Sequence, residues 1–405
     1  MVSVGAVLAA DPLFNSGIDF TVVLIILVKV VAVFAFLLIS VMLYIWFMRK
    51  VIADMQNRLG PMRAGPHGVL QTLADGIKLF FKEQSVPNTA DRPVFRLAPY
   101  LSLVPAFLAF SIVPIGGVVT IGSHVTELQL ADPPIGILIL LVASGLGVYG
   151  VMLAGWSSGS KYPLLGSVRA SAQLLSYEAA VGLSVVGVLV LTNTLSTRGI
   201  VAKQAWGSWD SFASQWLWLP AIGAFIIFLI AATAETNHPP FDFSEAEEEI
   251  AGGYHVEYSG IRFAIFYLAE FMNVITMSAI AVTLFLGGPS GPRIGFGLSA
   301  DHWINVWIVP VFWFLVKLIA LLYATVWVRA SLPRLRYDQL MNFGWKYLIE
   351  LAFVWIAISG VVVVLTDQGV SKWISVPSAV GGAVLVLFVL WLCVPRGDEL
   401  IEEIR

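Results

Sequence analysis

Long apolar stretches separated by short polar ones dominate the pattern along this chain. A helix that crosses a membrane needs about 20 consecutive, mostly apolar residues. Nine stretches meet that measure: 20–48, 97–119, 134–156, 172–193, 217–235, 261–286, 306–328, 346–366 and 374–394. The pattern therefore predicts an all-α polytopic transmembrane protein with about nine spanning helices, forming a single transmembrane domain over 1–405.

One internal segment carries a different period. Two Gly-Pro pairs, Gly60-Pro61 and Gly65-Pro66, favour turns. Apolar residues then recur at helical spacing over about 68–83, with polar residues opposite. This predicts an amphipathic helix in the plane of the membrane interface. Asp75 disfavours simple lipid anchoring, because a carboxylate gains nothing beside anionic headgroups.

Lysine and arginine are distributed unevenly between the two sides of the predicted spans. Seventeen of the 23 lie in segments on one side, including the segment after the first span, and four lie on the other. The positive-inside rule then places the N-terminus outside and the C-terminus in the cytoplasm, with the amphipathic helix on the cytoplasmic side. Lys29 lies within the first span, where we expect its amine to extend toward the surface.

The segment 235–260 is an acidic cytoplasmic loop between two apolar spans. It holds seven acidic residues and no lysine or arginine between Glu235 and Glu257. Three of its glutamates would share one face of a short helix: Glu245, Glu248 and Glu249. Two interpretations stay open. Crowded carboxylates in a poorly hydrated site would hold protons and relay them, or the segment is a solvated helix start with Ser244 as its cap.

Ionisable residues inside the predicted spans indicate function, because each costs about 2.5–3.5 kcal/mol to insert. Glu178 lies at the entrance of the fourth span, Glu270 inside the sixth, and Lys317 about halfway along the seventh. The alternative for Glu178 and Glu235 is a hydrated position at the interface.

Composition limits the chemistry of this chain. Apolar residues make up 58% and charged residues 12%. Cys393 is the one cysteine, which leaves no thiolate set for an iron–sulfur cluster or structural zinc. The sequence has no glycine-rich nucleotide motif and no credible catalytic triad. We therefore expect no catalytic residues, metal or cofactor of the chain's own, and no nucleic-acid partner.

Four internal segments, 49–83, 155–178, 234–249 and 336–341, carry a resemblance to a known family. They include Gln56-Asn57-Arg58-Leu59-Gly60-Pro61, Ala234-Glu235-Thr236-Asn237 and Arg336-Tyr337-Asp338-Gln339-Leu340-Met341. The chain resembles the H subunits of bacterial NADH:quinone oxidoreductase (respiratory complex I), a family that includes mitochondrial NADH dehydrogenase subunit 1. The resemblance covers about residues 20–366.

The resemblance implies a membrane-arm component that helps form the quinone chamber and couples quinone reduction to proton translocation. Quinone would be the substrate, and flavin and iron–sulfur clusters would lie on partner subunits of the peripheral arm. Further partners would be the proton-pumping subunits of the membrane arm and the lipid bilayer of a bacterial plasma membrane. Alternatives are the equivalent component of a membrane hydrogenase or non-NADH dehydrogenase, or a stand-alone proton or cation transporter, although no repeated halves are visible.

Residues carried over by motif position fall into two sets. The quinone tunnel would be lined by Arg49, Asp75, Tyr267 and Arg329. A buried acidic path toward the pumping subunits would contain Glu178, Glu235, Glu245, Glu247, Glu249 and Glu270.

The sequence departs from the family pattern at several positions. Met48 stands where the family usually has Glu, His238 where it has Arg, and Glu350 where proline is common. Glu248 is an additional acid, and the ninth span, 374–394, goes beyond the usual eight. Because histidine titrates near pH 6–7, His238 is expected to make the loop's proton affinity more dependent on pH.

Overall fold

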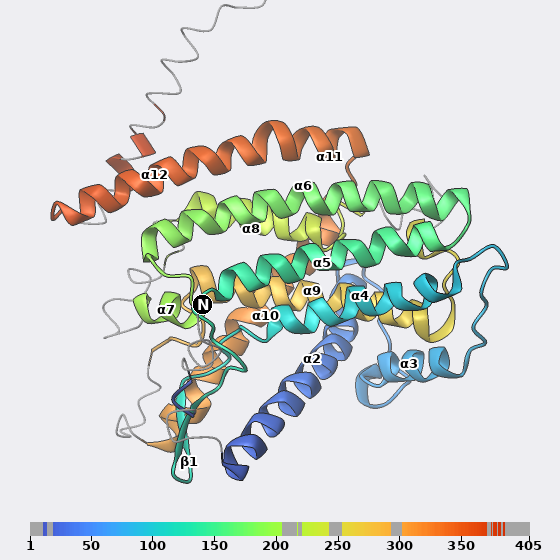
Figure 1. Cartoon of the computed structure of the whole chain (residues 1–405), viewed down its shortest axis with the longest axis horizontal. Coiled ribbons are helices and arrows are strands. Elements are labelled where there is room, and N and C mark those ends of the chain that lie inside the picture. Colours follow the sequence, from blue (N-terminus) through green and yellow to red (C-terminus); the bar gives the residue numbers. More distant parts are fainter. Residues whose placement is uncertain are drawn as a thin grey trace, which may run out of the picture.

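The apolar stretches fold into a bundle of long helices (Figure 1). The computed structural model describes residues 11–13, 19–204, 217, 221–242, 253–292, 302–370, 374, 376–378, 380–381 and 384. Within these residues, seven helices are long and apolar enough to cross a membrane, and one shorter apolar helix has 14 residues. The all-α, polytopic fold class is confirmed.

The long helices are α2 (Phe20–Met55), α4 (Arg92–Phe110), α5 (Gly136–Ser157), α6 (Lys161–Thr192), α9 (Gly260–Phe285), α10 (Val309–Ser331) and α12 (Ile349–Asp367). Shorter helices are α3 (Gln71–Phe81), α7 (Thr197–Lys203), α8 (Ile222–Glu235) and α11 (Tyr337–Phe343). Single turns η2 (Pro66–Gly68), η4 (Gly253–His255), η5 (Ile304–Ile308) and η6 (Gly344–Leu348) precede α3, α9, α10 and α12. The helix α3 lies within the stretch 68–83 where the sequence predicts an amphipathic helix.

The bundle helices alternate in direction in the order α2, α4, α5, α6, α8, α9, α10 and α12, so their connections gather at two ends of the bundle (Figure 1). We call the end with the β-hairpin and α7, residues 111–135 and 193–203, the hairpin end. The loop end carries α3, α11 and the described parts of the acidic segment after α8, residues 236–242 and 253–259. The predicted orientation places the loop end in the cytoplasm.

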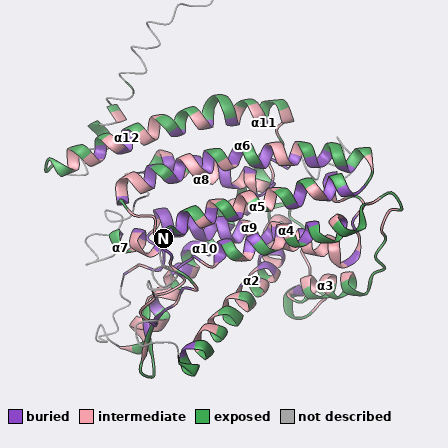
Figure 2. Cartoon of the chain, viewed as in Figure 1, coloured by how far each residue is buried: buried purple, intermediate pink, exposed green. Residues whose placement is uncertain are grey.

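Helix α9 is the centre of the bundle, and every residue from Val274 to Phe285 is buried. The surrounding helices bury only the side that faces the bundle. On α2, Leu27 and Val31 are more than half exposed, and Figure 2 shows exposed residues along the outer face of this helix. Close helix contact depends on small residues. A Cβ built on Gly150 of α5 would lie 2.2 Å from Ser102 Oγ of α4, so only glycine permits this approach.

The predicted span 97–119 is wrong at its C-terminal end. Helix α4 ends at Phe110, and β1 (Val118–Ile121) pairs antiparallel with β2 (His124–Glu127). Pro114 lies between helix and hairpin, and proline is a poor helix continuation. Gly122, at φ +62°, starts the two-residue turn. Hydropathy alone cannot separate such apolar strands from a span.

Two other helix boundaries differ from the prediction, and the first is the end of α2, which continues to Met55 beyond the predicted end at 48. Helix α6 begins at Lys161, eleven residues before the predicted start of the fourth span at 172, because polar residues can extend a helix beyond its apolar section. The predicted ninth span, 374–394, lies mostly outside the described residues.

Candidate functional site

Helix α2 presents Arg49 to α3 at the loop end. Arg49 Nη1 donates to Asp75 Oδ2 over 2.9 Å, and Gln71 Nε2, one turn earlier on α3, donates to Asp75 Oδ1 over 3.2 Å. Helix α3 thereby directs its carboxylate toward α2, while its apolar Ile77 and Phe80 remain exposed. The ion pair is about one-third exposed, so water screens part of its attraction.

Helix α10 ends beside the same stretch of α2. Arg329 Nη1 lies 3.3 Å from the sulfur of Met48, which directly precedes Arg49. One turn earlier, the Tyr44 hydroxyl lies 3.1 Å from Thr325 Oγ1. A thioether is a weak acceptor, so Met48 gives the guanidinium no charge partner of the kind a carboxylate would provide.

Helix α9 connects this region to the acidic segment through the ring of Phe271. Its centroid lies 5.9 Å from the Tyr44 ring and 4.6 Å from the Tyr267 ring. On another side, the His238 ring meets Phe271 edge-on at 5.4 Å. The neighbouring Glu270 Oε1 lies 3.4 Å from His238 Nδ1. Tyr267 and Glu270 are three residues apart on α9, so one helix turn carries members of both predicted sets.

A cavity of about 60 Å³ lies between the helices that carry the acidic residues, and both Glu235 and Glu270 line it. This volume can hold a few waters, since about 10–15 Å³ suffices for each. Ser144 of α5 donates to Glu235 Oε1. Glu235 Oε2 is buried without a hydrogen-bond partner among the described residues. The cavity is thus lined by a glutamate whose second carboxylate oxygen has no hydrogen-bond partner among the described residues.

Glu178 lies on the other side of the same stretch of α5. A Cβ built on Gly145 would lie 2.9 Å from Glu178 Oε1, so this carboxylate occupies the space that a side chain would need. The preceding residue, Ser144, holds Glu235. The pair Ser144-Gly145 therefore stands between two glutamates, and the acids follow one another in the order Glu270, Glu235, Glu178.

Gln173 of α6 braces the segment that follows Glu235. Its Nε2 donates to Ala234 O and Phe241 O, each over 2.8 Å, and lies 3.2 Å from Asn237 Oδ1. Asn237 has a φ of +52°, which asparagine tolerates better than most residues. Sequence inspection identifies Gln173 only as a polar residue, because three acceptors far along the chain have no local signature.

The expectation that His238 titrates near pH 6–7 is wrong for this structure. The side chain is 4% exposed, and Nδ1 donates to Thr236 O over 2.9 Å. Burial lowers the pKa of His238 to about 3, and the positive charge of Arg329 contributes to the lowering. The imidazole is therefore neutral at physiological pH and gives Glu270 a polar neighbour instead of a permanent cation.

The remaining predicted acids of the path, Glu245, Glu247 and Glu249, lie outside the described residues, as does Glu248. Their shared helical face stays a prediction.

Lys317, which the sequence marks as a costly charge inside a span, donates hydrogen bonds to the C-cap of α9 and to the turn that follows it. Its Nζ donates to Leu286 O over 2.6 Å, Gly288 O over 2.9 Å and Ser290 O over 2.5 Å. Carbonyls at a helix C-terminus lack partners within the helix and attract cations. These three bonds account for the buried ammonium as a helix cap.

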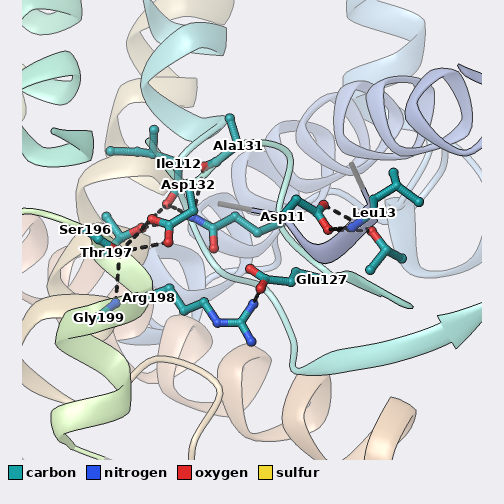
Figure 3. Close-up of polar contacts among 12 residues, drawn as sticks. Asp11, Leu13, Ile112, Glu127, Ala131, Asp132, Ser196, Thr197, Arg198 and Gly199 are labelled. Carbon is teal, nitrogen blue, oxygen red and sulfur yellow. Dashed lines mark hydrogen bonds and ion pairs between the residues drawn. The ribbon is translucent and has the colours of Figure 1, made fainter. Parts of the chain in front are cut away.

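A second polar cluster, which sequence inspection missed, lies at the hairpin end (Figure 3). Asp132 accepts from Ser196 Oγ over 2.9 and 2.8 Å and from Thr197 Oγ1 over 3.4 Å. Ser196 also caps α7 by accepting from Gly199 N over 3.0 Å. Burial raises the pKa of Asp132, and the hydroxyl bonds oppose that rise.

Two further acids close to this cluster, Asp11 and Glu127, each pair with a cation. Asp11 pairs with Lys29 at 2.8 Å and accepts from Thr126 Oγ1 over 3.1 Å, while Glu127 pairs with Arg198. Lys29 therefore points to an acid within the protein. These contacts hold the segment 11–13, the hairpin and α7 together.

Comparison with known proteins decides the family. A family model described as NADH dehydrogenase matches residues 28–360. The chain belongs to the NADH dehydrogenase family. A relative from Frankia casuarinae, named as the H subunit of NADH-quinone oxidoreductase, is 53% identical over 348 residues, which cover 86% of this chain and 74% of the relative. One from Frankia alni with the same name is 53% identical over 335 residues, covering 82% and 71%.

This family membership makes the chain a membrane component of NADH-quinone oxidoreductase, complex I, and an enzyme through that assembly. Other complex I subunits are its partners. The matched range ends at residue 360, before the predicted ninth span.

Proposed function

We propose that this chain forms part of the wall of the quinone chamber, between α2, α3, α9 and α10. Support comes from the loop end of α2, where Tyr44, Met48 and Arg49 contact each of the other three helices. Arg49, Asp75 and Arg329 offer polar groups for a quinone head, and the Tyr267 ring offers an apolar face. Such a mixture, mostly apolar with few polar groups, is typical of small-molecule sites.

The same chain starts an acidic path for protons or for the charge changes that drive them. The observation that carries this proposal is the cavity shared by Glu235 and Glu270, with Glu178 beyond Ser144-Gly145. Carboxylates lining a small polar cavity can exchange a proton through water or through a change of side-chain rotamer. Phe271 contacts both Tyr267 of the proposed chamber and His238 beside Glu270 of the path, so a charge at the chamber acts on the path over a short distance.

The proposed setting follows from orientation and family. The loop end would face the cytoplasm of a bacterium, with the N-terminus outside the plasma membrane. Peripheral-arm subunits with flavin and iron–sulfur clusters would deliver electrons to quinone there. The chain itself would bind quinone as substrate and supply positioning and proton-exchange groups.

Replacement of Asp75 by Asn tests the quinone chamber. The variant loses the ion pair with Arg49, and we expect NADH-dependent quinone reduction to fall by about tenfold, equivalent to about 1.4 kcal/mol. Electron flow from NADH to a soluble artificial acceptor should stay unchanged, because that acceptor takes electrons upstream. The measurement compares both rates in the purified complex.

Lys78→Gln is the matched control, since Lys78 lies one turn along α3 and is exposed. It should leave both rates at the parental level. An equal loss of both rates in Asp75→Asn, with all subunits present, would remove Asp75 from the quinone chamber.

A further inference from the structure

A large apolar pocket at the loop end lies apart from both proposed sites. Its volume is about 690 Å³, within the usual range for small-molecule sites. Ile230 and Phe241 form one wall, Leu332 and Leu335 a second, and Phe343 and Tyr347 a third. None of Arg49, Asp75, Tyr267, Arg329, Glu235 and Glu270 lines it. The proposed quinone chamber and acidic path therefore do not account for this pocket.

The position of the pocket corresponds to the edge of a bilayer. Ile230 is five residues before the end of α8, so the pocket reaches into the apolar section of the bundle. Tyr347 lies in the turn that precedes α12 and is 59% exposed, next to the exposed Trp345. Exposed tyrosine and tryptophan are enriched at the boundary between headgroups and acyl chains.

Basic residues surround this apolar wall. The segment 329–346 contains four basic residues and one acid, Asp338. Arg334 and Arg336 flank the lining residue Leu335, and Lys346 directly precedes Tyr347. Arg334 pairs with Asp242 at 3.1 Å and Arg336 with Asp338 at 3.0 Å. Lys346 is exposed and pairs with no acid among the described residues. The rim therefore has positive charge in excess.

We propose that this pocket binds an anionic phospholipid, with an acyl chain against the apolar wall and the phosphate at Arg336 and Lys346. Charge complementarity selects this occupant, because basic pockets between transmembrane helices on the cytoplasmic side bind anionic headgroups. An uncharged quinone head could accept hydrogen bonds from these cations but would form no ion pair with them, whereas a phosphate does both. The lining residues Gln339 and Asn342 are exposed and can donate to ester or phosphate oxygens.

Photo-cross-linking in the intact complex tests the proposal. The complex is reconstituted into phosphatidylcholine vesicles containing a small fraction of either phosphatidylglycerol or phosphatidylcholine with a diazirine on the same acyl chain. Peptide mass spectrometry then locates the label. We expect the anionic probe to label residues 332–347 or 230–241 at least about fivefold more than the zwitterionic probe, the ratio expected for one effective charge contact.

Variants separate the phosphate contact from the apolar wall. The double variant Arg336→Gln/Lys346→Gln should remove this roughly fivefold anionic preference and each single variant should remove part of it, while Lys161→Gln, at the exposed start of α6, should leave it unchanged. Leu335→Trp fills the pocket and should abolish labelling by both probes there. Retention of all subunits in the purified complex establishes that each variant assembles.

Three results would overturn the proposal. Equal labelling by both probes would indicate a general lipid or quinone contact without headgroup selection. Absence of label from the pocket in the parent complex would indicate that a partner protein covers it. Unchanged preference in the Arg336→Gln and Lys346→Gln variants would place the headgroup elsewhere.

Discussion

Two polar clusters occupy opposite ends of this bundle, and they differ in how their acids are satisfied. At the hairpin end, Asp11 and Glu127 each pair with a cation, and Asp132 accepts from two hydroxyls. At the loop end, Glu235 has one hydroxyl donor and a second oxygen without a partner among the described residues, beside a cavity.

This difference distinguishes a set of structural contacts, at the hairpin end, from a site whose charge can change, at the loop end. A fully bonded acid is held in one state, because moving it or its proton breaks several bonds. A buried carboxylate with an unsatisfied oxygen is costly, and such groups require an explanation beyond stability. From this comparison we propose that the hairpin end contributes stability and that the loop end exchanges protons.

The largest expected effect comes from crowding the space between Glu178 and Glu235. Gly145→Ala places a methyl 2.9 Å from Glu178 Oε1, so that carboxylate must move away. We expect the rate of proton pumping to fall by about tenfold, equivalent to about 1.4 kcal/mol in the barrier of the transfer step. Pumping is followed with a pH-sensitive dye in vesicles containing the complex.

Gly182→Ala on α6 provides the control, because its methyl would meet only Leu141 at 3.9 Å, an ordinary contact. This variant should pump as the parent does. Parental pumping in Gly145→Ala as well would show that the space beside Glu178 has no part in the path.

The hairpin end should respond in stability and not in coupling. Asp132→Asn disturbs the bonds from Ser196 and Thr197 and should destabilise the protein by about 1–3 kcal/mol. Burial raises the pKa of Asp132, so the parent itself loses stability as pH rises from the carboxyl's unfolded value through its folded one. The cost of the substitution should therefore be smaller at pH 7 than at pH 4.5.

Thermal midpoints of the purified complex at both pH values measure this cost. Asp367→Asn, an exposed acid at the C-terminal end of α12, should change neither midpoint. A cost for Asp132→Asn that grows with pH would contradict the assigned direction.

The smallest effect concerns His238, whose pKa burial lowers to about 3. Above its ordinary pKa of about 6.5 both folded and unfolded chains hold a neutral ring, and below it the unfolded chain binds the proton first. Stability should then fall with decreasing pH, by about 1.4 kcal/mol at pH 5.5. His238→Gln should remove this contribution and leave that of His255, whose pKa burial lowers to about 4, so thermal midpoints from pH 7.5 to 5.5 should fall less than in the parent.

His67→Gln is the comparison variant, because His67 is exposed. It should retain the parental dependence on pH. If His238→Gln retained the full parental dependence, the buried neutral ring of His238 would contribute nothing to it.

Hydropathy predicted most of the fold because each span must satisfy its own backbone in an apolar medium. It failed at 111–119, where β-branched residues in a hairpin have the same hydropathy as a span. It also could not foresee that Lys317 caps α9, because its three carbonyl partners depend on the turn at 286–290.

For the candidate site, the acids and cations were accessible from sequence, whereas their supports were not. Glu178, Glu235 and Glu270 are conspicuous because charge is rare in apolar stretches. Ser144, Gly145 and Gln173 are ordinary in composition, and their roles arise only from the packing of α5 and α6 against α8. His238 was misjudged, since sequence does not reveal burial.

The most direct test is the number of protons pumped per electron pair in vesicles containing the parent, Glu235→Gln or Asp132→Asn complex. Gln keeps the shape of Glu235 and its contact with Ser144 but cannot exchange a proton. The proton-to-electron ratio should fall in Glu235→Gln and match the parent in Asp132→Asn. A parental ratio in Glu235→Gln, with quinone reduction measured in the same vesicles, would contradict the assignment of proton exchange to the loop end.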